Sequence, residues 1–168
     1  AELAEKAQSI NANAIWHFIG PIQSNKTKTI ASFATWVHSV ERIKIAERLN
    51  KHCSDLNKSM NVLIQVNIDN EISKSGVQIG DVHPLAKFIE EHCSNLRLRG
   101  LMFMPSLTKS ENEKNESMER IKHAIEAISS DFKNFDTFSF GTSHDYPIAL
   151  KYGSNLIRVG ENIFGKRE

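Results

Sequence analysis

The chain has 168 residues, 40% of them hydrophobic and 24% charged, with a formal net charge of +1. A chain of this length can bury roughly 70% of its unfolded surface, enough for one domain over residues 1–168 with a single core. The near-neutral charge gives no reason to expect nucleic acid or an anionic membrane as a partner, and no apolar run approaches the roughly 20 residues of a membrane-spanning helix.

Strand-like apolar runs alternate with helical patterns along the chain. Strands are expected over residues 14–19, 36–40, 62–68, 98–104, 135–140 and 156–159. Helical patterns with one apolar stripe lie between them, over residues 43–49, 82–93 and 118–132; a short helix is expected over residues 143–152, and a further one opens the chain over residues 1–10. The third and fourth strands are almost continuously apolar, which is typical of parallel strands covered on both faces.

Local residues predict where several helices begin and end. Asp81 is expected to cap the 82–93 helix, with Pro84 in its first turn, where proline is tolerated. Ser110 and Glu113 have the spacing of a capping box before the next helix. The short helix that follows should end before Gly153.

Strand–helix alternation throughout predicts a parallel α/β architecture with right-handed crossovers. Six strands could form an open doubly wound sheet, but the sequence contains neither G-x-G-x-x-G nor G-x-x-x-x-G-K-[ST], and its phosphate-type turns follow the last two strands. We therefore predict a (β/α)8 TIM-type barrel, of which this chain supplies six βα units.

A barrel of this kind needs eight strands, so the first two βα units are expected to be absent from this chain. The 14–19 strand would then be an apolar edge, which natural proteins avoid. We expect a fragment that was cleaved or shortened, or one accompanied by a separate N-terminal piece, with self-association through the exposed edge as a further possibility.

Two segments near the C-terminus end an apolar run in a glycine: FSFGTS over residues 138–143 and LIRVGEN over residues 156–162. In a barrel, the loops after the last two strands commonly cradle a phosphate group with backbone amides. The candidate donors on these turns are Gly141, Thr142, Ser143, Gly160, Glu161 and Asn162. The alternatives are structural, with Ser143 only capping the next helix and Gly160 only serving a turn.

Arg158 lies on the last expected strand, beside the second glycine turn. A guanidinium there suggests that the phosphate belongs to a larger molecule, a cofactor. The alternative is an ion pair between Arg158 and a carboxylate at the barrel mouth.

Other residues exclude some functions and favour a location. Cys53 and Cys93 lie far apart with no C-x-x-C motif, which favours free thiols and a reducing, cytoplasmic location. The run Ser-His-Asp over residues 143–145 is not a catalytic triad, because successive residues point in different directions. The absence of an H-E-x-x-H motif from the sequence argues against a zinc site.

Five motifs occur in order along the chain. Residues 16–26 read WHFIGPIQSNK, 74–76 KSG, 98–102 LRGLM, 139–145 SFGTSHD and 157–165 IRVGENIFG. They resemble H-F-I-G-x-L-Q-x-N-K, K-x-G, R-G-L-M, S-x-G-M-S-x-D and R-I-G-x-x-I-F-G of the pyridoxal phosphate homeostasis proteins, single-domain relatives of the alanine racemase N-terminal barrel. The resemblance spans essentially the whole chain.

The resemblance implies a barrel that holds pyridoxal 5′-phosphate (PLP) at its C-terminal face. In the family a lysine at the end of the first strand forms a Schiff base with the cofactor, and that strand belongs to the portion expected to be missing. We therefore expect PLP to bind this chain weakly, or to be replaced by an inorganic anion.

The resemblance also implies roles for two residues of the second turn. In the related racemases an arginine at the place of Arg158 hydrogen-bonds the pyridine nitrogen. Guanidinium is a permanent donor, so the ring would stay unprotonated, which argues against transaminase chemistry. Many relatives carry Thr or Ser in place of Glu161, so Glu161 should offer only its backbone N–H and turn its carboxylate outward.

Some polar residues have less certain places in this scheme. Lys74 and Lys26 are possible amine donors near strand ends, with solvated surface lysines as the alternative. His17, Asn67 and Met102 are expected to line the barrel interior.

Three functions remain open at this point. The first is a PLP-binding protein of intracellular PLP homeostasis that buffers the cofactor or delivers it to client enzymes without robust catalysis. The second is a PLP-dependent amino-acid racemase or decarboxylase, which needs an acid or base opposite the lysine. The only tyrosines, Tyr146 and Tyr152, are poorly placed for that, on the helix after the first turn. The third is a phosphate-binding barrel unrelated to PLP.

Overall fold

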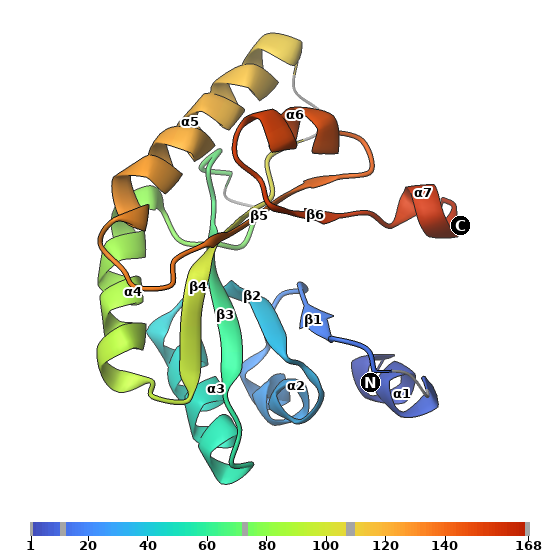
Figure 1. Cartoon of the computed structure of the whole chain (residues 1–168), viewed down its shortest axis with the longest axis vertical. Helices are drawn as coiled ribbons and strands as arrows, with labels where there is room; N and C mark the ends of the chain where they lie inside the picture. The colour runs from blue at the N-terminus through green and yellow to red at the C-terminus, as the bar shows by residue number, and fades with distance from the viewer. Residues whose placement is uncertain (1, 11–12, 72–73, 107–109, 167–168) are drawn as a thin grey trace.

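The computed structural model of the chain describes residues 2–10, 13–71, 74–106 and 110–166. Six parallel strands form one sheet whose spatial order follows the chain. They are β1 (His17–Phe18), β2 (Trp36–Val40), β3 (Met60–Val66), β4 (Leu96–Phe103), β5 (Thr137–Thr142) and β6 (Leu156–Arg158). Sequential order is that of a barrel wall, whereas a doubly wound sheet reverses its order. The predicted barrel is confirmed as a six-stranded part of a (β/α)8 barrel (Figure 1).

Helices connect the strands and cover one face of the sheet, with α3, α4 and α5 along its outer side in Figure 1. The helices are α1 (Glu2–Ser9), α2 (Thr27–Phe33), α3 (Ile43–Asp55), α4 (Ile79–His92), α5 (Glu111–Ser129), α6 (Tyr146–Lys151) and α7 (Glu161–Phe164), and a 3-10 turn, Ser24–Lys26, precedes α2. No helix in the described residues is both long and apolar enough to cross a bilayer.

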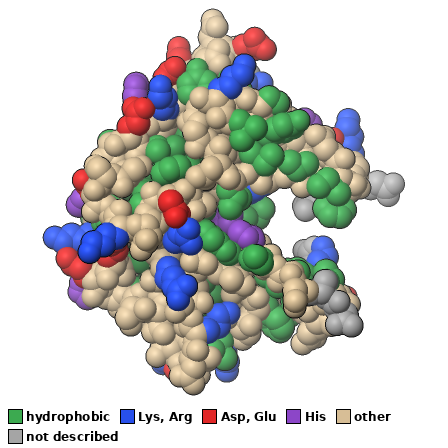
Figure 2. Space-filling view, viewed as in Figure 1, with side chains coloured by type: hydrophobic (Ala, Val, Ile, Leu, Met, Phe, Trp, Pro, Cys, Tyr) green, Lys and Arg blue, Asp and Glu red, His purple; other side chains and the backbone are tan. Residues whose placement is uncertain are grey.

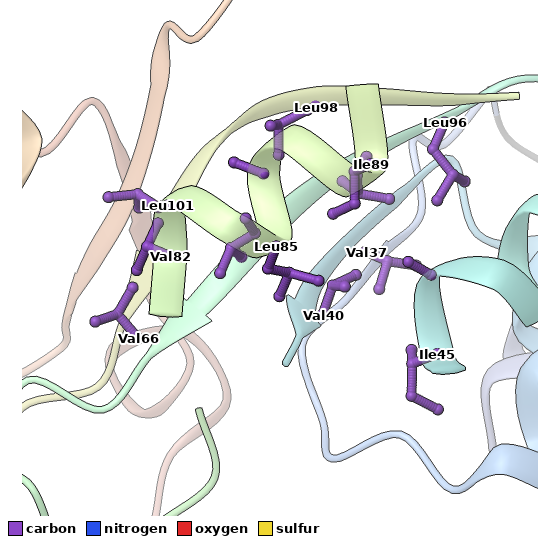
Figure 3. Close-up of a cluster of buried hydrophobic side chains, with 14 of the residues drawn as sticks. Val37, Val40, Ile45, Val66, Val82, Leu85, Ile89, Leu96, Leu98 and Leu101 are labelled. Atoms are coloured by element: carbon purple, nitrogen blue, oxygen red, sulfur yellow. The ribbon is translucent and has the colours of Figure 1, made fainter. Parts of the chain in front are cut away.

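The hydrophobic core lies between the sheet and these helices. Val37 and Leu101 on the strands and Ile45 and Ile89 on the helices are completely buried in it. Figure 3 shows strand side chains facing those of α3 and α4. Burying a side chain of this size contributes about 1.5–3 kcal/mol, so this interface stabilises the packing of the helices on the sheet.

A second buried layer lies on the opposite, inner face of the sheet. Leu63, Met102, His38 and Ser139 are fully buried, yet they are not part of the core under the helices. Strand side chains alternate between faces, and Leu101 points to the helices, so Met102 points inward as expected. The inner face therefore carries histidine and serine among apolar side chains.

The first predicted strand is shorter than expected. Only His17–Phe18 pairs as β1, and within the described residues it pairs with β2 alone. Ile15 and Ile19 beside it are 68% and 44% exposed. A strand with one partner has fewer ladder hydrogen bonds to hold its ends, which accounts for its length. The space-filling view shows a hollow between the N-terminal helix and the C-terminal helix, with hydrophobic side chains around it (Figure 2).

Two details of α4 correct the sequence prediction. The helix is capped by Gln78 rather than Asp81, which lies inside its first turn. Val77 is joined to β3 by hydrogen bonds with Gln65 and Asn67, so the chain enters the helix directly afterwards. Pro84 consequently falls within the helix and not in its first turn.

Other helix predictions fared differently. The capping box of Ser110 and Glu113 is confirmed at the start of α5. The predicted helix at the N-terminus is present as α1, although residue 1 lies outside the described residues. Helix α2 was not predicted, because its seven residues bury only Thr27, Ile30 and Ala31 and so show no extended apolar stripe.

The junction after β5 also differs from expectation. The strand continues to Thr142, two residues beyond the predicted end, and α6 begins at Tyr146 instead of residue 143. Gly141 and Thr142 are therefore part of the strand. The loop that follows consists of residues 143–145.

Candidate functional site

Two loops meet at the C-terminal end of the sheet. They follow β5 and β6, which are parallel neighbours, so both loops emerge at the same edge. Ser143 Oγ accepts hydrogen bonds from the backbone N–H groups of Gly160 and Asn162, each at 3.3 Å. Asn162 Nδ2 also donates to Ser143 O at 3.4 Å. Two amides from one loop thus converge on a single oxygen of the other, and the residues expected to share a phosphate lie together.

The structure does not support the alternatives that Ser143 only caps the next helix and that Gly160 only serves a turn. Asp145, not Ser143, is the N-cap residue of α6, and Ser143 directs its hydroxyl to the neighbouring loop. Gly160 has φ −120°, which any residue adopts, and a Cβ added there would meet no atom within 4 Å. Neither the backbone nor the packing of the protein therefore requires glycine at this position.

Gly141 has a steric role that its neighbours make plain. Its φ is +93°, a left-handed conformation that favours glycine. A Cβ at this position would lie 2.7 Å from Ala149 Cβ and 3.1 Å from Tyr146 Cα. Glycine is needed here because α6 packs directly against β5, which in turn sets the position of Ser143.

Thr142 is engaged within its own loop. Its backbone N–H and its Oγ1 hydroxyl both donate to Asp145 Oδ1, at 2.6 and 2.7 Å. A carboxylate therefore occupies the two donors that the sequence offered to a phosphate. In this arrangement Thr142 shapes the loop and presents neither donor to a ligand.

The Glu161 side chain also has a partner. Its Oε2 lies 2.7 Å from Nε2 of the exposed His144, across the two loops. The pair fixes the carboxylate at His144, while Gly160 and Asn162 direct their amides to Ser143. In the sequence, His144 stands out only as part of the rejected triad; its pairing with Glu161 was not predicted, because its position in the loop gives no sign of which side chain faces it.

Arg158 extends from β6 over the inner face of the sheet. Its Nη1 donates to Ser139 O at 2.8 Å and to Ser139 Oγ at 2.7 Å, and its Nη2 donates to Phe103 O at 2.9 Å. Burial lowers the pKa of Arg158, and the negative charge of Asp145 opposes that shift. The guanidinium is thus held by three hydrogen bonds at the mouth of the partial barrel.

Two histidines continue this polar layer and were not recognised as a unit from the sequence. His38 Nδ1 lies 3.1 Å from Ser139 Oγ, and His38 Nε2 lies 2.8 Å from His17 Nδ1. Burial, together with His17 and Arg158, lowers the pKa of His38 to about 3, so its ring is neutral. His17 stacks on Trp36 with ring centroids 5.3 Å apart.

Of the three residues expected to line the interior, Asn67 turns away from it. His17 lies at the outer end of the inner face, where its ring contacts His38; the residue is exposed, although part of its ring is covered and burial lowers its pKa. Asn67 is buried but turns to its own loop, where Nδ2 donates to Glu71 O at 2.8 Å. An amide at the end of a strand satisfies the backbone of the loop that follows, which accounts for the difference.

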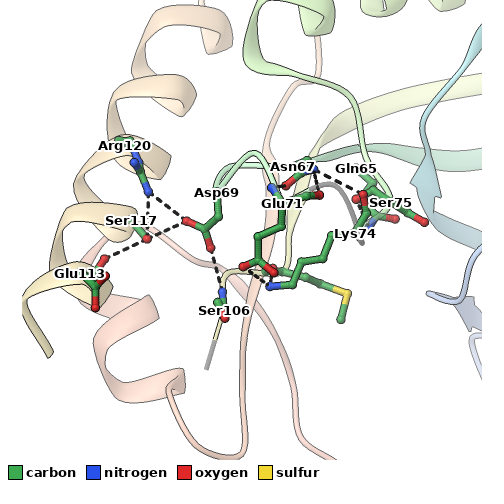
Figure 4. A network of polar contacts seen from close by, with 11 residues as sticks. Gln65, Asn67, Asp69, Glu71, Lys74, Ser75, Ser106, Glu113, Ser117 and Arg120 are labelled. Carbon is green, nitrogen blue, oxygen red and sulfur yellow. Dashed lines mark hydrogen bonds and ion pairs between the residues drawn. The ribbon is translucent and has the colours of Figure 1, made fainter. Parts of the chain in front are cut away.

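The loop after β3 is held at the same end of the sheet by a polar network (Figure 4). Asp69, whose side chain is 2% exposed, accepts hydrogen bonds from Ser117 and Arg120 on α5 and from the N–H of Ser106. Lys74 Nζ donates to Met104 O at 3.3 Å and pairs with Glu71 at 3.1 Å. The network joins the loops after β3 and β4 to α5.

Two hollows adjoin these residues. A cavity of about 560 Å³ lies between the start of α5 and the start of α6, with His144 and Asp145 in its wall. A second hollow of about 700 Å³ lies between α1, β1 and α2 and includes His17 and Lys26. Among the described residues, no group of three His, Cys, Asp or Glu side chains could hold a metal ion.

Comparisons with known proteins give a consistent result. The whole chain, residues 1–168, matches the family described as the alanine racemase N-terminal domain. The pyridoxal phosphate homeostasis protein of Haemophilus influenzae is 41% identical over 171 residues, which cover 99% of this chain and 72% of that protein. The protein of the same name from Escherichia coli is 39% identical over 153 residues, covering 91% of this chain and 65% of the relative. The chain thus spans between 65% and 72% of the length of these two relatives.

Solved structures share the fold. PipY of Synechococcus elongatus, solved without PLP, has a TM-score of 0.81 at 25% identity over 96% of this chain and 75% of its own. PipY with PLP bound has a TM-score of 0.76 at 24% identity, over 92% of this chain and 72% of its own. An alanine racemase from Clostridium difficile has a TM-score of 0.72 at 12% identity, over 98% of this chain and 43% of its own, a likeness of fold alone.

Proposed function

Since the chain belongs to the alanine racemase N-terminal domain family, we propose that it binds PLP and takes part in PLP homeostasis, holding the cofactor and delivering it to client enzymes. Its relatives in Haemophilus influenzae and Escherichia coli are named pyridoxal phosphate homeostasis proteins, and PipY has been solved with PLP bound. The observation that carries the proposal is the convergence of the Gly160 and Asn162 amides on Ser143 Oγ, on the strand ends that also present Arg158.

The phosphate would bind between the loops after β5 and β6. A phosphate group carries about −1.5 to −2 charges and three strong acceptor oxygens. The amides of Gly160 and Asn162 already point at one oxygen, and the Ser143 hydroxyl can rotate to donate to another. The open space at Gly160 lets a phosphate approach the backbone closely. The donors therefore fit the group in number and polarity.

The ring of the cofactor would lie toward Arg158. Guanidinium donates and cannot accept, so it suits an unprotonated pyridine nitrogen. Three hydrogen bonds to Ser139 and Phe103 hold the guanidinium in one orientation. When bound, PLP supplies a reactive aldehyde and an electron-withdrawing ring. The residues of this chain bind and orient it.

We propose storage or transfer of the cofactor in preference to robust catalysis. Racemisation requires acids or bases on both faces of a substrate carbon. The two tyrosines of the chain, Tyr146 and Tyr152, are the first residue of α6 and the residue after its last, behind the phosphate loops. Both cysteines are free and buried, which supports a reducing, cytoplasmic location.

We also propose that residues 1–168 act as one PLP-binding unit whose β1 edge pairs with a further strand. The exposed Ile15 and Ile19 beside β1 favour a covered edge. That strand would come from a separate N-terminal segment or from a second copy of the chain. Analytical ultracentrifugation and mass spectrometry of the purified protein separate these arrangements.

Titration tests the function. Binding of PLP, pyridoxal and inorganic phosphate is measured by calorimetry, and PLP should bind more tightly than either of its parts. Ser143→Ala should weaken binding of PLP and phosphate by about tenfold, the scale of a hydrogen bond to a charged group. Ser130→Ala, an exposed serine at the end of α5, is the matched control and should bind as the parent does.

Two outcomes would contradict the proposal. If PLP binds no more tightly than phosphate, the site is a phosphate site unrelated to the pyridine ring. If the protein converts L-alanine to D-alanine in the presence of PLP at enzyme-like turnover, the protein is a racemase.

A further inference from the structure

A row of four side chains crosses the inner face of the sheet and ends at Arg158. It begins with His17 on β1, passes through His38 on β2 and Ser139 on β5, and reaches Arg158 on β6. The three contacts measure 2.8, 3.1 and 2.7 Å. Strands β3 and β4 lie between β2 and β5 in the sheet, so the row spans its concave side.

Arg158 sets the direction of these hydrogen bonds. A guanidinium can only donate, so Ser139 Oγ accepts from Arg158 Nη1. Ser139 is completely buried, and in the described part of the chain His38 is the other partner of its hydroxyl. A buried hydroxyl proton without an acceptor is costly, so Ser139 donates to His38 Nδ1.

The same reasoning continues along the row. Because His38 accepts at Nδ1 and its ring is neutral, its proton lies on Nε2. His38 Nε2 faces His17 Nδ1 at 2.8 Å and therefore donates to it. His17 in turn keeps its proton on Nε2. Arg158, the donor at the end of the row, thus fixes the tautomers of both histidines, including His17, which is three contacts away.

We propose that His17, His38 and Ser139 are positioning residues, a polarised row that holds the Arg158 guanidinium in the orientation in which it meets a pyridine nitrogen. This inference rests on the proposed function for the identity of the ligand, while the row itself exists without one. Ser139 engages Arg158 through both its hydroxyl and its carbonyl, so loss of the hydroxyl frees one side of the guanidinium. The stack of His17 on Trp36 holds the outer end of the row.

Nuclear magnetic resonance of the unliganded protein tests the row directly. The protein is labelled with 15N and measured at pH 8, with His17→Gln and His38→Gln used to assign the ring signals. We expect a scalar coupling across the hydrogen bond between His38 Nε2 and His17 Nδ1, with the proton attached to His38. Ser139→Ala should abolish this proton signal or broaden it, and Ser139→Thr, which keeps the hydroxyl, should retain it.

Calorimetric titration supplies the link to ligand binding. Ser139→Ala should weaken PLP binding about tenfold, and Ser139→Thr should stay within about twofold of the parent. Ser130→Ala, an exposed serine at the end of α5, is the matched control for the serine change and should leave the affinity unaltered.

Specific results would overturn the inference. If the shared proton lies on His17 Nδ1 and not on His38 Nε2, the hydrogen bonds run in the opposite direction and the inference is wrong. If the histidine ring signals are unchanged in Ser139→Ala, the histidine tautomers do not depend on Arg158. Equal PLP affinity in Ser139→Ala and the parent denies it a positioning role. If the parent itself fails to bind PLP, the proposed function fails while the ring signals still decide whether the row exists. If Ser139→Ala does not fold, the spectrum of the parent alone gives the direction.

Discussion

Replacing Gly141 by alanine should destabilise the protein more than the same change at Gly153, although the two backbones have nearly the same φ, +93° and +96°. An added Cβ at Gly141 would lie 2.7 Å from Ala149 Cβ, whereas one at Gly153 would meet no atom within 4 Å. Gly153 is therefore a matched control that separates backbone strain from packing.

The two costs can be worked out from their parts. A residue other than glycine in the left-handed region loses about 1–2 kcal/mol, and alanine regains about 0.4–1 kcal/mol by restricting the unfolded chain. About 1 kcal/mol of destabilisation is therefore expected for Gly153→Ala. Overpacking against α6 adds about 1–3 kcal/mol, which brings Gly141→Ala to about 2–4 kcal/mol. Domains are stable by only about 5–15 kcal/mol, so the loss is large.

Urea unfolding followed by tryptophan fluorescence measures both free energies. The difference between the two variants should be at least 1 kcal/mol with unchanged m-values. Gly141→Ala should also weaken phosphate binding, because α6 must move and Ser143 precedes it in the chain. Equal destabilisation of the two variants would refute the close packing of α6 on β5, and with it the reason given for the place of Ser143.

Three further predictions concern charge and burial. Lowering the pH from 7.5 to 5 should cost about 2 kcal/mol of stability through His38, whose pKa falls from 6.5 when unfolded to about 3 when folded. The unfolded chain then binds the proton more readily, so the loss grows as the pH falls from about 6.5 toward 3. Urea midpoints measured across this pH range should show the loss of stability, and His38→Gln should make stability less dependent on pH. An equally steep pH dependence in that variant would show that other groups cause the loss. His144→Ala should weaken phosphate binding about fivefold at low salt, because it releases the Glu161 carboxylate. In a Glu161→Thr background the same histidine change should have no effect on phosphate affinity. Calorimetry that shows no effect of His144→Ala in the parent would contradict this role of the pair. Arg120→Ala should lower the free energy of unfolding by about 1–2 kcal/mol, because it leaves the buried Asp69 with fewer donors. Lys87→Ala, which removes an exposed pair with Glu91, should lower it by under about 0.5 kcal/mol. Similar thermal midpoints for the two variants would show that the Asp69 network does not stabilise the protein.

The sequence predicts the sheet well because parallel strands that are buried on both faces require continuous apolar runs, which are easily recognised. The runs that became β3 and β4 are almost continuously apolar, and β2, β3 and β4 all lie within two residues of their expected bounds. The order of the turns favours a barrel over a doubly wound sheet, and the strand order agrees. Helix α2 escaped prediction, since a seven-residue helix has no room for a repeating stripe.

The topology predicts that the loops after β5 and β6 meet, but it does not predict the partners of their side chains. Neighbouring parallel strands end at one edge, which brings Ser143 to Gly160 whatever the loops contain. The choice of Asp145 as partner for Thr142 depends on loop torsions that no periodicity reports. The contact of His38 with Ser139 joins residues 101 positions apart and follows only from the curvature of the sheet.

Charge balance around the loops explains why these side-chain pairs matter to anion binding. Asp145 and Glu161 place two carboxylates on the two loops that meet at Ser143, and each unit of like charge at about 4 Å opposes an anion by about 1 kcal/mol in water. Thr142 donates twice to one carboxylate and His144 contacts the other, so both carboxylates are held in place by hydrogen-bond partners. The two amides converge on the uncharged Ser143 oxygen, which an anion can displace without breaking an ion pair. The affinity of the site for phosphate should therefore depend on the residues that hold its carboxylates as well as on the donors themselves.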